Sequence, residues 1–138
     1  MDFKLELVAV PVTDVDRAKD FYVNQVGFVA DMDQVVSDEI RFVQLTPPGS
    51  ACSIAIGKGL TKMEPGSLDS LQMVVADAEA ARAELLGRGV AVSEVDVMPW
   101  GSFAYFTDPD GNAWAVQQLP DWSKGLGGSG DSSQGWTG

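Results

Sequence analysis

The sequence contains no histidine among its 138 residues. This absence removes the commonest general base, the Ser-His and Cys-His nucleophile pairs, and the commonest side-chain ligand of transition metals. There is one cysteine, Cys52, which excludes a framework of disulfides within the chain. Any catalysis or metal binding must therefore depend on other side chains.

The chain also has few basic residues and no long apolar run. Nine Lys and Arg face twenty Asp and Glu, for a formal net charge of -11, which repels phosphates and argues against DNA or RNA as partner. No apolar stretch approaches the ~20 residues of a membrane helix, and the first ten residues lack the features of a signal peptide. A hydrophobic content of 45% is typical of a globular protein. We expect a cytoplasmic protein without nucleic-acid or membrane partners.

The sequence does contain an internal repeat. VPVTDVDRAKDFYVNQVGF resembles MVVADAEAARAELLGRGV, and FVQLTPPGSACSIAIG resembles FAYFTDPDGNAWAVQQ. Matched residues are 61 to 63 positions apart, and Asp14 and Asp77, for example, are 63 positions apart. The repeat predicts two units of one strand, one helix and three strands over residues 4–57 and 69–119, joined by a linker over 58–68.

Local signals agree with this order of elements. Alternation in LELVAVPV predicts a first strand with Val8, Val10 and Val12 on one face. Thr13 is expected to cap the following helix, and Gly27 to end it. The other strands of the two units are expected at residues 29–34, 39–46, 51–57, 70–76, 90–98, 102–107 and 113–119.

The composition changes near the C-terminus. Residues 1–120 are expected to form one domain, whereas residues 121–138 are rich in Gly and Ser, the composition of a flexible tail. Trp122 and Trp136 are exceptions within this tail, and each is a candidate for docking elsewhere.

The repeat, with VTDVDRAKDFY after the first strand and FTDPDGNAW before the last, resembles the vicinal oxygen chelate superfamily. This superfamily includes glyoxalase I, bleomycin-resistance proteins, fosfomycin-resistance enzymes and extradiol dioxygenases. The resemblance covers about residues 4–119. It implies an α+β, glyoxalase-like fold in which two tandem βαβββ units form a curved mixed sheet around a cavity. Because two chains often complete that cavity, we expect a homodimer.

The resemblance also implies where a metal would bind. Enzymes of the superfamily usually hold a divalent metal with His, Glu or Gln from the first and last strands of the units. The matching positions here are Leu7, Ser53, Ser70 and Ala115. Leu and Ala have no lone pair, and a serine hydroxyl is a poor ligand without charged neighbours. We therefore expect a metal-free branch, with no metal and no other cofactor.

Strand parity predicts which side chains line the cavity, because successive residues of a strand point to opposite faces. With Leu7 taken as inward, rings and neutral hydrogen-bonding groups fall on one face. The predicted ligand-binding lining is Leu7, Phe42, Gln44, Ser53, Ser70, Gln72, Phe103, Tyr105, Ala115 and Gln117. Such an uncharged lining suits a small, partly aromatic organic molecule.

Some of these residues have a second interpretation. Trp100, in a loop expected at the cavity mouth, is either a lid over the ligand or a dimer contact. Phe42 and Phe103 suit a core as well as a pocket. Gln44 is favoured as a ligand contact, because a buried amide needs hydrogen-bond partners. Tyr105 is the candidate catalytic residue if the protein is an enzyme.

This lining suggests two functions. One is a binding protein that sequesters a drug or metabolite, as bleomycin-resistance proteins do. The other is a metal-independent enzyme, such as a cyclase or isomerase. A third possibility is that the chain binds no ligand and is only a dimerising module. Binding is favoured because the lining has no group whose ordinary pKa lies near neutrality. A cavity carboxylate from Asp31, Asp33 or Asp96, whose facing the sequence leaves open, would favour the enzyme.

Overall fold

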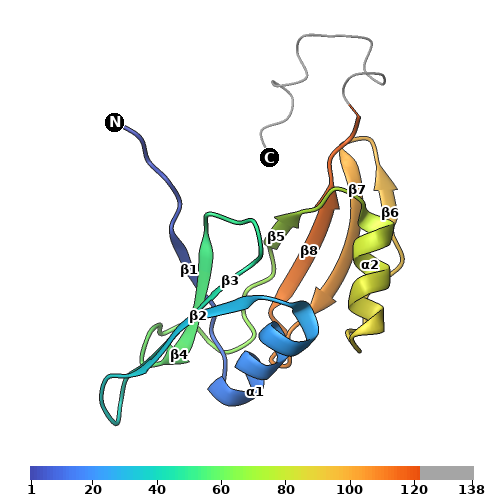
Figure 1. Cartoon of the computed structure of the whole chain (residues 1–138). Coiled ribbons are helices and arrows are strands. Elements are labelled where there is room, and N and C mark those ends of the chain that lie inside the picture. Colours follow the sequence, from blue (N-terminus) through green and yellow to red (C-terminus); the bar gives the residue numbers. More distant parts are fainter. Residues whose placement is uncertain (122–138) are drawn as a thin grey trace.

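The computed structural model describes residues 1–121 (Figure 1). Apart from Asp121, the expected tail over residues 121–138, including Trp122 and Trp136, lies outside the described residues. The expected fold is confirmed, since the chain is α+β with two tandem units. Each unit forms a four-stranded mixed sheet of its own and carries its own helix. No helix of the described part is long and apolar enough to cross a membrane.

The first unit follows the predicted order. Its elements are β1 (Leu7–Ala9), α1 (Val15–Asp20), the π-helical segment η1 (Phe21–Val26), β2 (Val29–Val35), β3 (Arg41–Thr46) and β4 (Ser53–Lys58). The strands lie in the order β1-β4-β3-β2, with β1 parallel to β4 and the other pairs antiparallel. Gly27 ends the helical stretch, as predicted, with a φ of 97° that side chains disfavour.

The second unit repeats this topology. Its elements are β5 (Leu71–Val74), α2 (Ala78–Gly87), β6 (Asp96–Met98), β7 (Gly101–Thr107) and β8 (Ala113–Gln118), with the strand order β5-β8-β7-β6. Only the end of the strand predicted over residues 90–98 forms a ladder, as β6. The preceding residues turn their apolar side chains into the core, and one backbone bond, from Ser93 to Tyr105 (2.9 Å), ties them to β7.

One core spans both units. Each sheet turns alternate residues toward it, with Val43, Leu45, Ile54 and Ile56 from the first and Ala104, Phe106, Trp114 and Val116 from the second. Helix α1 packs against β4, and α2 packs against β7 and β8. Figure 1 shows the two sheets side by side. The opposite face of each sheet is therefore left free of helices from its own unit.

Helix α1 begins differently from the prediction. The residue that caps it is Asp14, whose carboxylate accepts a hydrogen bond from the Arg17 amide (3.0 Å). Thr13 instead donates its hydroxyl to Asp110 of the β7–β8 turn (2.7 Å). The prediction was wrong because it rested on local spacing, whereas the partner of Thr13 lies 97 positions away.

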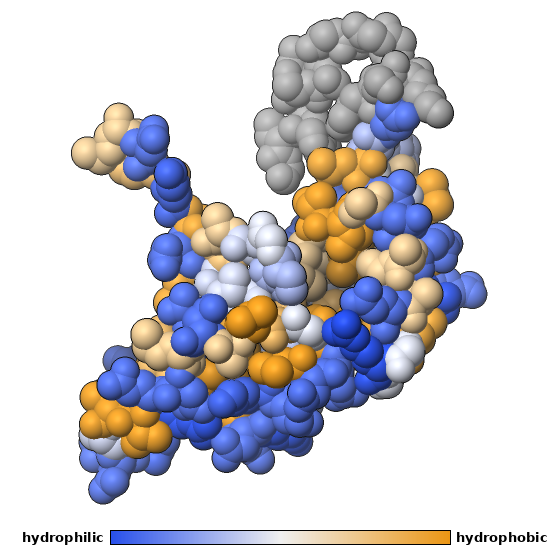
Figure 2. All heavy atoms as spheres, in the orientation of Figure 1, coloured by the Kyte–Doolittle hydropathy of each residue, from blue (hydrophilic) through white to orange (hydrophobic). Residues whose placement is uncertain are grey.

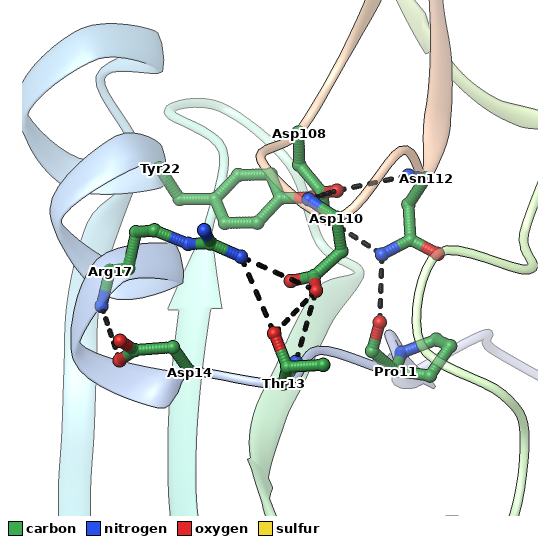
Figure 3. Close-up of polar contacts among 8 residues, drawn as sticks. All are labelled: Pro11, Thr13, Asp14, Arg17, Tyr22, Asp108, Asp110 and Asn112. Carbon is green, nitrogen blue, oxygen red and sulfur yellow. Dashed lines mark hydrogen bonds and ion pairs between the residues drawn. The ribbon is translucent and has the colours of Figure 1, made fainter.

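A buried polar cluster joins the two units (Figure 3). The Asp108 carboxylate accepts hydrogen bonds from the Tyr22 hydroxyl (2.7 Å) and the Asn112 amide (2.8 Å). Asn112 also donates to the Pro11 carbonyl (2.8 Å), and Trp114 donates its indole N–H to the Tyr22 oxygen (2.9 Å). Tyr22, Asp108 and Asn112 are all buried, so these bonds are shielded from water and strengthened by the low dielectric.

The environment of Tyr22 fixes its state. Burial and the nearby Asp108 carboxylate raise the pKa of Tyr22 far above its ordinary range. The phenol therefore stays protonated and donates its hydrogen bond to the Asp108 carboxylate. Removing that donor would leave a buried carboxylate short of a partner, which costs more than an average hydrogen bond contributes.

We expect Tyr22→Phe to lower the free energy of unfolding by about 1–3 kcal/mol, because both Asp108 and Trp114 lose a partner. Urea denaturation followed by circular dichroism measures the change. Tyr105→Phe is the matched control, since Tyr105 is 43% exposed and its hydroxyl has no hydrogen-bond partner among residues 1–121. The control should change stability by at most about 0.5 kcal/mol. Equal losses in the two variants would contradict the role given to the cluster.

Candidate functional site

The candidate site of the second unit lies on the sheet face that points away from the core. The ladder pairs Gln72 with Ala115, Ala115 with Tyr105, and Gln117 with Phe103. Because cross-strand partners share a face, these five side chains lie on one side of the sheet, as strand parity indicated.

A cavity of about 590 Å³ opens on this face. Its lining includes six of the eleven residues predicted to bind a ligand, namely Ser70, Gln72, Trp100, Phe103, Tyr105 and Ala115. Sequence reasoning missed Asp69 and Met98, which also line it. Their positions next to Ser70 and to the Pro99-Trp100 loop were the available signal. The lining is therefore not wholly uncharged, since Asp69 contributes a carboxylate.

Two parallel aromatic rings stand next to each other in this cavity. The rings of Phe103 and Tyr105 are stacked, with planes 4° apart and centroids 6.3 Å apart. Ala115 lies beside Tyr105 across the ladder, and its methyl group leaves room that a longer acidic side chain would fill. A ring surface beside open space suits the stacking of an aromatic molecule.

The loop that carries Trp100 is tied to the sheet through Gln117. The Gln117 amide nitrogen donates to the Trp100 carbonyl (3.5 Å), and the Gln117 amide oxygen accepts from Gln72 (2.9 Å). A Cβ at Gly101 would lie 2.8 Å from the Gln118 carbonyl oxygen and 3.2 Å from the Gln117 amide nitrogen, so glycine permits this close approach. Gln117 is thus buried and does not line the cavity, whereas Trp100 is 48% exposed.

The first sheet has a comparable face. Leu7 pairs with Ser53 across the β1–β4 ladder. Gln44 donates its amide N–H to the Ser53 hydroxyl (3.3 Å), and the Ser53 and Thr46 hydroxyl oxygens are 2.6 Å apart. Thr46 in turn donates to the Asp31 carboxylate. These polar groups form one continuous chain across the face.

Sequence reasoning missed two members of this chain. Thr46 lies two residues after Gln44 on β3, so strand parity was sufficient to place it on the same face. Asp31 lies at an irregularity in the β2–β3 register between Ala30 and Met32, and such a bulge breaks the alternation that parity depends on. Phe42, the remaining predicted residue, pairs with Gly57 and is half-buried on the same face as Gln44.

The two faces are separate within the described part of the chain. As far as residues 1–121 show, none of Leu7, Phe42, Gln44 and Ser53 lines the cavity of the second sheet. A second recess of about 480 Å³ lies between residues 47–50, which connect β3 to β4, and the β5 and α2 elements. Figure 2 shows the surface hollowed between the two halves. Gln72 borders both spaces.

The ladders correct one of the positions matched to metal ligands. Gln44 pairs with Ala55 as Tyr105 pairs with Ala115, so the counterpart of Ala115 is Ala55 and not Ser53. The connection before β4 is one residue longer than the connection before β8, so the offset between the units falls from 61 at Gln44 and Tyr105 to 60 at Ala55 and Ala115. The matching failed because it used the offset of 62 between the turn glycines Gly49 and Gly111.

The donors present do not fit a metal centre. Alanine at both last-strand positions and Leu7 in the first strand offer no side-chain lone pair. Ser70 and the neighbouring Asp69 supply only one hydroxyl and one carboxylate. Within residues 1–121 there is no group of three or more His, Cys, Asp or Glu that is placed to hold a metal ion. A zinc or iron site needs three or four such ligands.

The structure also shows which way Asp31, Asp33 and Asp96 face, which the sequence left undecided. Asp33 accepts ion-pair contacts from Lys19 and Arg41 (both 2.8 Å), which hold the pKa of Asp33 well below its usual range. It therefore lies on the helix side. Asp96 pairs with Phe103 and shares its face, but it does not line the cavity. Asp31 is the carboxylate in contact with candidate site residues.

Comparisons with known proteins agree with this architecture. The model of the Glyoxalase/Bleomycin resistance protein/Dioxygenase superfamily matches residues 4–116. The structure of TnmS3, an antibiotic binding protein from Streptomyces sp. CB03234, is 39% identical with a TM-score of 0.79, and the match covers 86% of this chain and 98% of that one.

Two further relatives extend the comparison. A glyoxalase/bleomycin resistance protein from Streptomyces sp. CB03234 is 41% identical with a TM-score of 0.74, over 83% of this chain and all (100%) of that one. The protein YetH of Bacillus subtilis (strain 168) is 28% identical over 113 residues, which are 80% of this chain and 94% of YetH. The repeat, the two sheets and these matches together establish that the chain belongs to the Glyoxalase/Bleomycin resistance protein/Dioxygenase superfamily.

Proposed function

We propose that this protein binds a small, partly aromatic organic molecule, a drug or a metabolite, and sequesters it without changing it. The observation that carries the proposal is the cavity on the second sheet, where the stacked Phe103 and Tyr105 rings lie beside Ala115 and the Gln72 amide. Ligand pockets are commonly apolar and aromatic, with a few polar groups that orient the ligand. The similarity to TnmS3, an antibiotic binding protein, supports a drug-like ligand.

The proposal includes metal independence. The positions that hold metal ligands in related enzymes carry Leu7, Ser70, Ala55 and Ala115 here, and none supplies an imidazole or a carboxylate. Without charged ligands, the cost of stripping water from a divalent ion is not offset. Binding then depends on stacking and on hydrogen bonds, without a metal ion.

The proposal also includes a homodimer. The polar chain of the first sheet and the aromatic cavity of the second sheet lie on separate open faces, and a second copy can place one opposite the other. Exposed apolar side chains support an interface, since Val74 on the face of β5 is 64% exposed. The first residues of the chain extend away from the body (Figure 1), and Phe3 among them is 89% exposed. Such surfaces favour association.

A metal-independent enzyme is the second candidate, and one observation favours it. Asp31 accepts a hydrogen bond from Thr46, whose oxygen lies 2.6 Å from that of Ser53. A carboxylate joined to two hydroxyls is able to move a proton along that chain. Tyr105 on the other sheet is a donor for such a reaction. Recovery of the added compound in unaltered form distinguishes binding from this alternative.

The ring of Trp100 is expected to stack on the ligand. For 2,6-dihydroxynaphthalene, Trp100→Ala should weaken binding by about 1–3 kcal/mol, as for a buried aromatic anchor. Isothermal titration calorimetry measures the affinity, and mass spectrometry of the compound afterwards tests for a reaction. Leu86→Ala is the control, because Leu86 is an exposed apolar residue of α2 outside both recesses. Unchanged affinity in Trp100→Ala would place this ring outside the site.

Purified protein is expected to contain no stoichiometric transition metal. Elemental analysis checks this directly, and calorimetry in the presence and absence of EDTA should give the same affinity for the probe. Loosely held cations on the acidic surface should wash out with salt, because surface charges are screened. Binding that is lost on chelation and restored by one metal would contradict the assignment of the metal positions.

In solution the protein is expected to have twice the mass of the 14.7 kDa chain. Analytical ultracentrifugation over a range of concentrations measures the mass. Val74→Arg should shift the equilibrium toward the monomer, because a charge would be buried in the interface. Glu79→Arg, an exposed position on α2, is the control for the added charge. A monomer at all concentrations would rule out a cavity completed by a second copy.

A further inference from the structure

We propose that the ligand is a molecule that donates hydrogen bonds, such as a phenol, because both candidate faces end in an outward glutamine carbonyl. The inference rests on the proposed function and specifies the chemistry of its ligand. Each sheet carries a chain of hydrogen bonds, one from Asp31 to Gln44 and the other from Trp100 to Gln72. In each chain, a group that only accepts hydrogen bonds fixes the direction of every bond that follows.

On the first sheet, the fixed end is the Asp31 carboxylate. An ionised carboxylate accepts hydrogen bonds and donates none, so the Thr46 hydroxyl must donate to it. The Thr46 oxygen then accepts a hydrogen bond from the Ser53 hydroxyl (2.6 Å). With its one proton used, Ser53 accepts, and the Gln44 amide N–H donates to it (3.3 Å).

The same logic fixes the far end of this chain. If the Gln44 amide were reversed, its oxygen would face the Ser53 oxygen with no proton between them. The amide nitrogen therefore points to Ser53, and the Gln44 carbonyl oxygen is directed outward. It accepts no hydrogen bond from any residue between positions 1 and 121. Gln44 is half-buried, so this oxygen gains from any donor that a ligand brings.

On the second sheet, the fixed end is the backbone carbonyl of Trp100, which also only accepts. It receives the amide N–H of Gln117 (3.5 Å), so the Gln117 oxygen points the other way and accepts from Gln72 (2.9 Å). Gln72 thereby directs its own carbonyl oxygen away from Gln117. Within the described residues, that oxygen too has no donor.

Both faces thus present acceptors where a ligand would lie. Gln72 borders the cavity, and the Asp69 carboxylate in its lining is a further acceptor. A ligand that offers only acceptors, such as an ether, would face these oxygens without a proton between them. In the proposed homodimer, a ligand with hydroxyl or N–H groups would donate to the glutamine oxygens of both faces. Discrimination is strong when a site built for a hydrogen bond meets a ligand that lacks it.

The test compares 2,6-dihydroxynaphthalene with 2,6-dimethoxynaphthalene, which share a ring system but differ in donors. Isothermal titration calorimetry gives both dissociation constants for the full chain. We expect the diol to bind about tenfold more tightly or better, the effect of one or two hydrogen bonds. Equal binding, or tighter binding of the ether, would overturn the inference and leave the proposed function standing. If neither compound binds, the proposed function fails and the inference with it.

Asp31→Asn changes the direction of the hydrogen bonds on the first sheet without changing the space available to a ligand. The new amide can donate to Thr46, which lets every hydrogen bond from position 31 to Gln44 reverse its direction. The Gln44 N–H then points outward. The preference for the diol should fall about threefold or more, although the space on the face is unchanged. Asp33→Asn is the matched control, since it makes the same change on β2 but on the helix side. Its ratio of dissociation constants should equal that of the unmodified protein. A ratio unchanged in Asp31→Asn would overturn the inference for Gln44.

Gln72→Lys tests the second sheet in the same way. The ammonium group keeps a donor for the Gln117 oxygen and replaces the outward acceptor by donors. We expect the diol to lose its advantage over the ether, with a change in the ratio of about tenfold. Thermal denaturation checks that the variant is folded. A ratio that stays at the unmodified value would overturn the inference for Gln72.

Discussion

The structure depends on one buried carboxylate. Asp108 lies in the turn between β7 and β8, and it accepts hydrogen bonds from Tyr22 of the first unit and from Asn112 of its own turn. Asn112 extends the contact to the Pro11 carbonyl, at the point where the chain leaves β1. A buried carboxylate is tolerated only when it is fully paired. The relative position of the two units is therefore fixed, because Asp108 and Asn112 of the second unit must reach Tyr22 and Pro11 of the first unit at the same time.

This constraint determines which faces of the sheets are available. With Tyr22 and Trp114 in contact at the centre of the core, the core side of each sheet is filled by side chains and helices. The opposite sides carry the candidate residues, and they point to separate spaces. In the proposed homodimer, the two faces would form complementary halves of one site, with the Phe103 and Tyr105 rings opposite the hydrogen bonds that run from Asp31 to Gln44. One supplies apolar area, and the other supplies directed hydrogen bonds.

The repeat in the sequence predicted the fold because it is carried by alternation and turn residues, which act locally. Strand parity placed Gln72, Phe103, Tyr105 and Ala115 on one face for the same reason. Three features depend on a distant partner, on a bulge or on loop length, and they were not predictable from alternation and turn residues. Thr13 donates to Asp110 rather than capping the helix. The bulge at Asp31 changes the face to which the Asp31 side chain points. Ala55, and not Ser53, is the counterpart of Ala115. Register after a turn depends on loop length, which a match of turn glycines does not measure.

The cluster around Asp108 also joins residues from the two ends of the domain, so it can form only after most of the chain has been synthesised. Tyr22 finds its partner 86 positions later, and Pro11 finds Asn112 101 positions later. During synthesis, the first unit leaves the ribosome with its phenol unpaired and its apolar face uncovered, because the strands that complete the core are made last. Contacts of such long sequence separation slow folding. Until the second half is made, the first half exposes apolar surface, and transiently exposed surface of this kind favours aggregation.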